Sequence, residues 1–210
     1  MNLFEIQQWI EQDQLLSFHL KRKAKGTRKC LEKGRKIQIS PEKLVLVETG
    51  VLASCYQKRD LIYALTLPHD YLRMSQSGTY IEALQTTYYL EYDLNDVEET
   101  LKQDSLFTHL LLSLLYKEEQ IRDHHLFYAT HSVEEKIQYT FSLFLQKEVR
   151  LVEPLETGDM VFPRWFNLTL LARLINASSV SVSKMLPSVA QQMNITTNTK
   201  TWRWKRIQDK

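Results

Sequence analysis

Short apolar segments bounded by turn residues follow one another in the first half of the chain. Turn residues such as Thr49-Gly50 and Gln57–Asp60 separate segments that are rich in β-branched and aromatic side chains. This pattern predicts five strands, at Leu44–Val47, Val51–Tyr56, Leu61–Leu67, Tyr80–Leu84 and Thr86–Tyr92. Short strands at regular spacing are typical of a compact β-roll or barrel.

Helical spacing of apolar residues surrounds this strand-rich region. Ahead of it, one or two short helices are predicted from Phe4, Trp9, Ile10, Leu15 and Leu16. Behind it, Asn95 and Glu98 form a capping box, which predicts a helix beginning at Asn95. A longer helix is predicted from Asp104 or Ser105 to about Thr130, because this segment contains neither Gly nor Pro.

The long helix carries a seam of side chains that repeats every seven residues. Its members are Phe107, Leu110, Leu114, Lys117, Ile121, His124 and Tyr128. A seam of this length predicts pairing with another helix, and the five apolar members are the predicted homodimer interface: Phe107, Leu110, Leu114, Ile121 and Tyr128. The alternative is a helix buried inside one chain, but the polar Lys117 and His124 favour a partly exposed dimer helix.

A further helix and a loop follow the long helix. Ser132 and Glu135 form a second capping box, ahead of apolar residues on one helical face: Ile137, Phe141, Phe144 and Leu145. Pro154 and Gly158 then predict a loop.

The segment from Asn167 to Gln191 predicts a helix-turn-helix. Asn167 can cap a first helix from Leu168 to Leu174 or Ile175. Asn176 lies where the turn needs a positive φ, and Ser178 can cap a second helix. The small Ala172 is expected where the helices cross. Three side chains of the second helix are expected to pack on the first: Val182, Met185 and Leu186.

The outward face of the second helix suits the DNA major groove. It is expected to present Ser179, Val180, Ser183 and Lys184, which are short side chains and one cation that can reach a guanine edge or a phosphate. The alternative is a helical hairpin used only for packing. Pro187 removes an N–H and clashes with the carbonyl of Ser183, so it is predicted to kink the helix or end it one turn early.

A β-wing is predicted after the helical hairpin. Ile195-Thr196 and Thr201–Ile207 alternate like two strands around the tip Thr197–Lys200. Contacts to the sugar-phosphate backbone are expected from Lys200, Arg203, Lys205 and Arg206. Trp202 and Trp204 are expected to close a small core rather than stack on bases. The residues predicted to bind DNA are Asn167, Thr169, Ser178, Ser179, Val180, Ser183, Lys184, Lys200 and Arg203.

Charge strengthens the nucleic-acid interpretation of the C-terminal region. Between Glu82 and Met160 there are 16 acidic residues and six basic ones, whereas from Val161 onward there are eight basic residues and one acid. A basic C-terminal region behind an acidic middle fits a phosphate-binding surface. The run from Lys21 to Lys36 has nine basic residues and one Glu. It could bind an anionic effector or DNA flanks, but we favour a merely solvated run.

Composition excludes several other classes. No apolar stretch approaches the roughly 18 residues that cross a bilayer, and no signal peptide precedes the first strands, so we expect a cytoplasmic protein without membrane contact. No nucleophile-elbow, P-loop, paired-carboxylate or metal motif points to an enzyme, and no cofactor is expected. Cys30 and Cys55 could sense redox state, although lone cysteines are usually small buried hydrophobes. His124-His125 is expected to be a solvated pair.

These motifs together resemble the Crp/Fnr superfamily of bacterial regulators over nearly the whole chain. The resemblance rests on Leu44–Ala53, on Leu65–Leu72, on the Phe107–Tyr128 seam and most strongly on the helix-turn-helix. The chain is most similar to the divergent Gram-positive, PrfA-like branch. The resemblance implies an α+β fold with a cyclic-nucleotide-binding-like β-roll (residues 1–103), a long dimerisation helix (104–130) and a C-terminal winged helix-turn-helix (131–210).

The sequence departs from family members that bind cyclic nucleotides. Arg73-Met74 stands where their Gly-Glu pair binds ribose, and Gly78-Thr79 stands near their phosphate-binding Arg-Ser/Thr pair. Cyclic AMP is therefore not expected to bind, because the ribose loses its acceptor and the phosphate its cation. Two cysteines also cannot supply the four thiolates of an iron–sulfur cluster.

The sequence thus predicts a homodimeric transcription regulator that binds a palindromic site in double-stranded DNA. RNA polymerase is a further expected partner, and the effector is unknown. The alternative function is a degenerate family member that acts through protein contacts without specific DNA readout.

Overall fold

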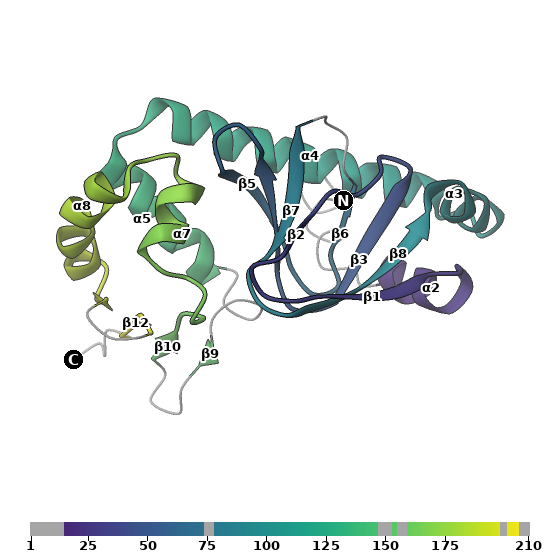
Figure 1. The fold of residues 1–210 in the computed structure, drawn as a ribbon, viewed down its shortest axis with the longest axis horizontal. Coiled ribbons are helices and arrows are strands. Elements are labelled where there is room, and N and C mark those ends of the chain that lie inside the picture. Colours follow the sequence, from purple (N-terminus) through teal and green to yellow (C-terminus); the bar gives the residue numbers. More distant parts are fainter. Residues whose placement is uncertain (1–14, 74–77, 147–152, 155–158, 198–200, 206–210) are drawn as a thin grey trace, which may run out of the picture. The chain divides into compact units, whose positions relative to one another are not determined.

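The computed structural model describes residues 15–73, 78–146, 153–154, 159–197 and 201–205 (Figure 1). The chain divides into two compact units, Met1–His124 and His125–Lys210. The boundary between the units falls inside the long helix α4, Phe107–Thr130. Within the described residues, no helix combines the length and the apolarity that crossing a membrane requires.

The first unit contains two antiparallel four-stranded sheets. One has the order β1 (Thr27–Leu31), β8 (Thr87–Asp93), β3 (Lys43–Thr49) and β6 (Tyr71–Arg73). The other has the order β2 (Lys36–Ile37), β7 (Thr79–Ala83), β4 (Leu52–Tyr56) and β5 (Leu61–Thr66). All five predicted strands are confirmed, each within about two residues of its predicted ends.

Three strands of this unit, β1, β2 and β6, were not predicted, because none of them contains an apolar segment as long as those of the predicted strands. The clearest is β1, where only Leu31 is buried and the other four residues are exposed. It forms a strand because it pairs with β8 at the edge of the sheet. Two ion pairs link it to the neighbouring strands, Lys29–Glu91 at 2.7 Å and Arg28–Glu48 at 2.7 Å. The run Lys21–Lys36 is exposed, as expected, but five of its cations form ion pairs and are not merely solvated: Lys23, Arg28, Lys29, Arg35 and Lys36.

The strand β3 is buried on both of its faces. Val45 and Val47 point into the core between the two sheets, together with Leu52 and Ile81 from the opposite sheet. Leu44 and Leu46 point the other way, into a second core that three helices cover. Because both faces are covered, the strand is almost continuously apolar.

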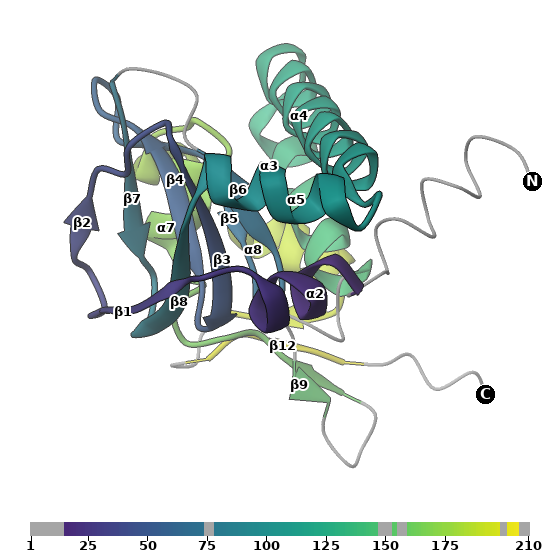
Figure 2. The same ribbon diagram turned by 90° about the vertical axis from the view of Figure 1, so that its right-hand side faces the viewer.

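The three covering helices are α2 (Leu15–Lys23), α3 (Leu94–Gln103) and the first part of α4 (Figure 2). In the core between these helices and the sheet, α2 contributes Leu16 and Leu20, α3 contributes Val97 and Leu101, and α4 contributes Leu110. The predicted N-terminal helices are thus confirmed in part by α2, whereas Phe4, Trp9 and Ile10 lie outside the described residues.

The predicted capping box at Asn95 and Glu98 is wrong. Asp93 is the N-cap of α3, and its carboxylate accepts a hydrogen bond from the Asn95 N–H at 3.1 Å. The physical reason is long-range: Asp93 pairs with Lys43 in the sheet, and the Lys43 ammonium binds its carboxylate at 3.0 Å. The strand therefore ends at a residue that is already positioned to cap the helix.

The long helix begins at Phe107, two to three residues after its predicted start. Asp104 caps the C-terminus of α3, and Ser105 adopts a positive φ of 59°, so neither residue can begin α4. The predicted end at Thr130 is confirmed.

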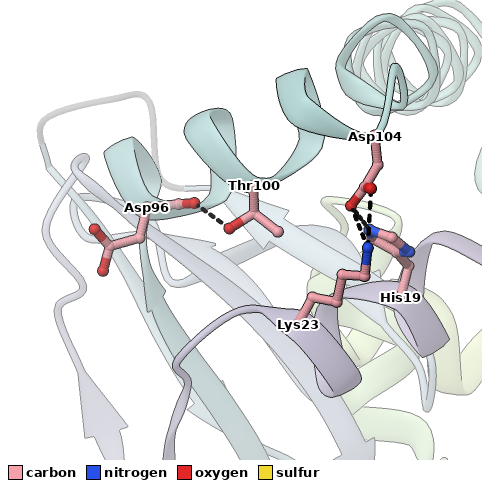
Figure 3. A network of polar contacts seen from close by, with 5 residues as sticks. All are labelled: His19, Lys23, Asp96, Thr100 and Asp104. Carbon is pink, nitrogen blue, oxygen red and sulfur yellow. Dashed lines mark hydrogen bonds and ion pairs between the residues drawn. The ribbon is translucent and has the colours of Figure 1, made fainter.

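Asp104 also links α2 to the junction between α3 and α4 (Figure 3). Its carboxylate accepts hydrogen bonds from Lys23 Nζ at 2.9 Å and lies 2.8 Å from His19 Nε2. The Lys23 ammonium first, and then His19, lowers the pKa of Asp104 below its ordinary value.

The second unit packs three helices on a small four-stranded sheet. The helices are α5 (Val133–Gln146), α7 (Leu168–Leu174) and α8 (Ser179–Gln192). The sheet has the order β11 (Ile195–Thr196), β12 (Arg203–Trp204), β10 (Met160–Val161) and β9 (Glu153–Pro154). The loop predicted around Pro154 is thus corrected: Pro154 belongs to a strand, and the pairing of β10 with β12 makes the wing four-stranded.

Two local features of this unit agree with the sequence. The Ser132 capping box is confirmed, because Ser132 Oγ accepts from the Glu135 N–H at 3.3 Å and Glu135 accepts from the Ser132 N–H at 2.8 Å. The predicted apolar face of α5 enters an aromatic core in which Phe141 contacts the rings of Phe162, Phe166 and Trp202.

Candidate nucleic-acid interface

The first helix of the helix-turn-helix is confirmed. Asn167 is the N-cap of α7, and its Oδ1 accepts a hydrogen bond from the Leu170 N–H at 3.0 Å. The apolar side of α7 is buried through Leu170, Leu171, Ala172 and Leu174. Thr169, in the first turn, is exposed.

The turn and the start of the second helix are also as predicted. Asn176 has a φ of +52°, and the Ala177 N–H bonds to the Ala172 carbonyl at 3.0 Å. Ser178 caps α8, and its Oγ accepts from the Ser181 N–H at 3.0 Å. Each end of the turn is therefore fixed by hydrogen bonds within a few residues.

The helix α8 has a buried face and an exposed face. Val182, Leu186, Val189 and Ala190 are buried, and Met185 is half-buried. Four predicted DNA-binding residues are exposed: Ser179, Val180, Ser183 and Lys184. Val180 is 79% exposed, although it is apolar.

The prediction that Pro187 ends the helix early is wrong. The helix continues to Gln192, five residues beyond the proline. Pro187 itself is exposed, so its ring does not have to enter the core. Val189 and Ala190 are buried beyond it, and the Met193 N–H closes the helix on the Val189 carbonyl at 3.0 Å. Packing of the final turn therefore outweighs the one backbone hydrogen bond that proline removes.

The predicted wing pairs as expected, with Ile195 opposite Trp204 and Thr196 opposite Arg203. Arg203 and Lys205 are exposed, whereas Lys200 and Arg206 lie outside the described residues. Trp202 is buried and packs edge-on against Phe166 at 5.2 Å, as predicted for a residue that closes the core. Trp204 is half-buried.

The segment that forms α7, α8 and the wing has one sign of charge. The sequence from Val161 to Lys205 contains six Lys or Arg and no Asp or Glu. Among its described cations, the exposed ones are Arg164, Lys184, Arg203 and Lys205. Arg164, just ahead of α7, was not among the predicted site residues, and the charge pattern is the signal that finds it. A surface of this kind attracts a polyanion.

The predicted dimer seam of α4 divides between two surroundings. Leu110 is buried in the core of its own chain, and Phe107 and Leu114 pack against the same core. Ile121 is half-buried, and the half-buried Tyr128 shares a hydrogen bond with Thr140 Oγ1 at 2.9 Å. At the start of α4 the seam residues therefore pack inside their own chain, as the alternative interpretation expected.

The polar seam residue Lys117 is also explained within the chain. Its ammonium donates to the Tyr71 carbonyl at 3.2 Å, lies 4.1 Å from the centre of the Tyr71 ring and is 3.6 Å from Asp70. It does not need a second chain for partners. The opposite side of α4 presents exposed leucines instead: Leu111, Leu112, Leu115 and Leu126.

The region where relatives bind cyclic nucleotides is described in part. Arg73 is exposed and its Nε donates to the Pro41 carbonyl at 3.4 Å, and Thr79 is buried in β7. Met74 lies outside the described residues. The strands that build the hydrophobic cluster between the two sheets also carry buried polar side chains, Ser54 on β4 and Thr79 on β7.

Cys30 is exposed on β1 and Cys55 is buried in β4. The paired His124 and His125 are half-buried rather than fully solvated. In the part of the chain that the structure describes, no three His, Cys, Asp or Glu side chains gather in a metal-binding arrangement.

No protein-family model and no curated protein matches the sequence. Solved structures do match. A cyclic nucleotide-binding domain-containing protein from Listeria monocytogenes superimposes with a TM-score of 0.71 at 16% identity, covering 95% of this chain and 96% of that one. The c-di-GMP-responsive global regulator CLP from Xanthomonas campestris gives 0.67 at 14% identity, covering 92% and 100%. A CRP/FNR-family transcriptional regulator from Thermus thermophilus gives 0.63 at 15% identity, covering 86% and 94%.

The fold is that of the Crp/Fnr transcriptional regulators. The predicted α+β class, with a cyclic-nucleotide-binding-like roll and a winged helix-turn-helix, is confirmed at the level of fold. Proteins less than 20% identical in sequence can share a fold and still bind different ligands and DNA sites, because binding depends on individual side chains.

Proposed function

We propose that the chain is a transcription regulator that binds a two-fold symmetric site in double-stranded DNA as a homodimer. The observation that carries the proposal is the α7–α8 hairpin, in which both helices are capped and α8 presents Ser179, Val180, Ser183 and Lys184 to solvent. If the hairpin served only for packing, the exposed face of α8 would not need to be free of acidic residues.

In this proposal the first two turns of α8 enter the major groove. Lys184 donates to a guanine edge or a phosphate, and the short serines allow close approach. Thr169, Arg203 and the other wing cations lie against the sugar-phosphate backbone and set the register of the protein on DNA. The absence of carboxylates from Val161 to Lys205 supports this orientation, because no like charge opposes the phosphates.

The homodimer is proposed to form through α4, but on the face opposite the predicted seam. Leu115 is 66% exposed and Leu126 is 64% exposed, and Leu111 precedes Leu115 by one helical turn. A second copy of α4 is the occupant that fits such a stripe on a long helix.

We propose that cyclic AMP does not control this regulator. Arg73-Met74 stands where relatives carry the Gly-Glu pair, so ribose would lack its carboxylate acceptor, and Arg73 Nε donates to the Pro41 carbonyl at 3.4 Å. Addition of cyclic AMP should leave the DNA affinity unchanged. We also propose that the protein is cytoplasmic and that it belongs to the PrfA-like Gram-positive branch. The low glycine content of its roll, with four glycines in residues 1–103, supports this branch.

Lys184→Ala tests the proposed function. The full-length protein is first used to select duplexes from a random library, and the Kd of the selected duplex is then measured by gel shift. We expect Lys184→Ala to raise this Kd about tenfold or more, since a base or phosphate contact of this kind is worth roughly 1–3 kcal/mol.

Lys102→Ala is the matched control, because it removes one exposed lysine from α3 and should leave the Kd unchanged. Failure to select any duplex would refute the proposal and favour the alternative, a family member that acts through protein contacts.

A further inference from the structure

Val180 is the most exposed of the large hydrophobic side chains that the structure describes, at 79%. It lies in the first turn of α8, next to the Ser178 cap. Neither packing nor helix propensity explains it, because it touches no core and β-branched residues are poorer helix formers than alanine. Since Val180 lies on the face of α8 that is proposed to enter the major groove, its methyl groups are available for contact with a base edge.

The neighbours of Val180 leave its methyl groups clear of the helix surface. Ser179 and Ser183 have short side chains. Among the exposed base-reading residues predicted on α8, Lys184 is the longer neighbour of Val180, and it lies one helical turn further along. The surroundings carry positive charge and no carboxylate. The complementary partner is therefore anionic overall and offers an apolar group at the point that α8 reaches.

We infer that Val180 reads the 5-methyl group of thymine, so that each half-site carries a T·A pair at that position. The inference rests on the proposed DNA-binding function and adds to it the chemistry that selects a base. Among the groups that base pairs present in the major groove, the thymine methyl is the apolar one, whereas the others are hydrogen-bond donors and acceptors. Valine has no polar atom with which to recognise those.

Thymine-to-uracil exchange tests the inference, because it removes only the methyl group. In the duplex selected by the full-length protein, each thymine is replaced in turn by deoxyuridine, and the Kd is measured by fluorescence anisotropy. We expect one symmetry-related pair of thymines to stand out, with about a fourfold rise in Kd for each methyl removed, the value for one buried apolar carbon.

Two variants connect this effect to Val180. In Val180→Thr the side chain keeps its shape but replaces one methyl by a hydroxyl, and in Val180→Ala both methyls are removed. We expect both variants to bind the thymine duplex more weakly and to show a smaller uracil effect at the same position, because each has fewer methyl groups for the contact. Gln191→Ala, exposed near the other end of α8, is the control and should keep the full uracil effect.

The outcomes separate the two proposals. If a duplex is selected but uracil changes the Kd nowhere, or changes it equally in Val180→Ala, the thymine inference is overturned and the DNA-binding function stands. If no duplex is selected, both are overturned, and Val180 belongs to a surface for another partner.

Discussion

Single residues fix the backbone of the roll where two strands meet. Gly50, between β3 and β4, has a φ of +92°, and a Cβ built there would lie 2.7 Å from the Thr87 Cα and 2.8 Å from the Thr86 carbonyl oxygen. The Val51 N–H bonds to Thr87 Oγ1 at 3.1 Å beside it. Gly34 also has a positive φ, of 78°, but no atom lies within 4 Å of its built Cβ.

These two glycines provide a matched pair of variants. Gly50→Ala should lower the free energy of unfolding by clearly more than 1 kcal/mol, since it combines a strained φ with a backbone clash, whereas Gly34→Ala should cost only about 1 kcal/mol. Urea denaturation of the two variants measures the difference. Equal losses would mean that the β3–β4 turn relaxes around the added methyl.

Asp104 makes the stability of the first unit depend on pH. Its pKa is lowered in the folded state by Lys23 and His19, so the unfolded chain binds more protons. The stabilisation is thus present above the unfolded pKa of about 3.9 and is lost as the pH falls through the lower folded-state pKa.

We therefore expect Asp104→Asn to lower the melting temperature at pH 7, and the gap to wild type to close as the pH falls below about 4. Thermal unfolding followed by circular dichroism across this range checks it. Glu99→Gln, which removes an exposed carboxylate from α3, is the control and should give a small, pH-independent change. A gap that persists in acid would show that the ion pairs with Asp104 are not its cause.

At the scale of elements, local signals and packing compete along α8. The cap at Ser178 and the turn at Asn176 are encoded within a few residues, and both are confirmed. The effect of Pro187 is not local, because burial of Val189 and Ala190 holds the last turn in place. The helix therefore carries an unfavourable residue that tertiary contacts outweigh.

Pro187→Ala should consequently stabilise the second unit, by about 1–3 kcal/mol, because it restores a backbone N–H and removes the clash with Ser183. The DNA affinity should change less than about twofold, since the base-facing residues precede the proline. Thermal unfolding and gel shift measure the two effects. Ser188→Ala, at the next exposed position, is the control, and a loss of stability in Pro187→Ala would contradict this account.

At the scale of the whole molecule, the proposed assembly depends on α4. Residues 110–115 read Leu-Leu-Leu-Ser-Leu-Leu, so this part of the helix is apolar almost all round. The roll covers Leu110 and Ser113, and leaves Leu111, Leu112 and Leu115 exposed.

Leu115→Glu should therefore convert the proposed dimer to a monomer and weaken binding to a symmetric DNA site by at least tenfold, through loss of the second half-site. Sedimentation velocity measures the assembly. Phe18→Glu, which places a charge at an equally exposed apolar residue on α2, should remain dimeric. A Leu115→Glu protein that is still dimeric would move the interface away from this face of α4.

The sequence by itself determined the features whose signals span only a few residues. The sequence signals are short apolar segments bounded by turn residues for β3, β4, β5, β7 and β8, caps at Ser132, Asn167 and Ser178, and a left-handed turn at Asn176.

Only the tertiary structure decided the features that depend on distant partners. The polar segment Thr27–Leu31 is a strand because it pairs with β8. Asp93 is positioned to cap α3 because its carboxylate forms an ion pair with Lys43. A polar Lys117 is accommodated in the seam because its ammonium bonds to the Tyr71 carbonyl and lies near Asp70. The heptad seam of α4 could not be assigned to a partner for the same reason. A helix that is apolar on most sides gives no local signal for which side its own chain will cover.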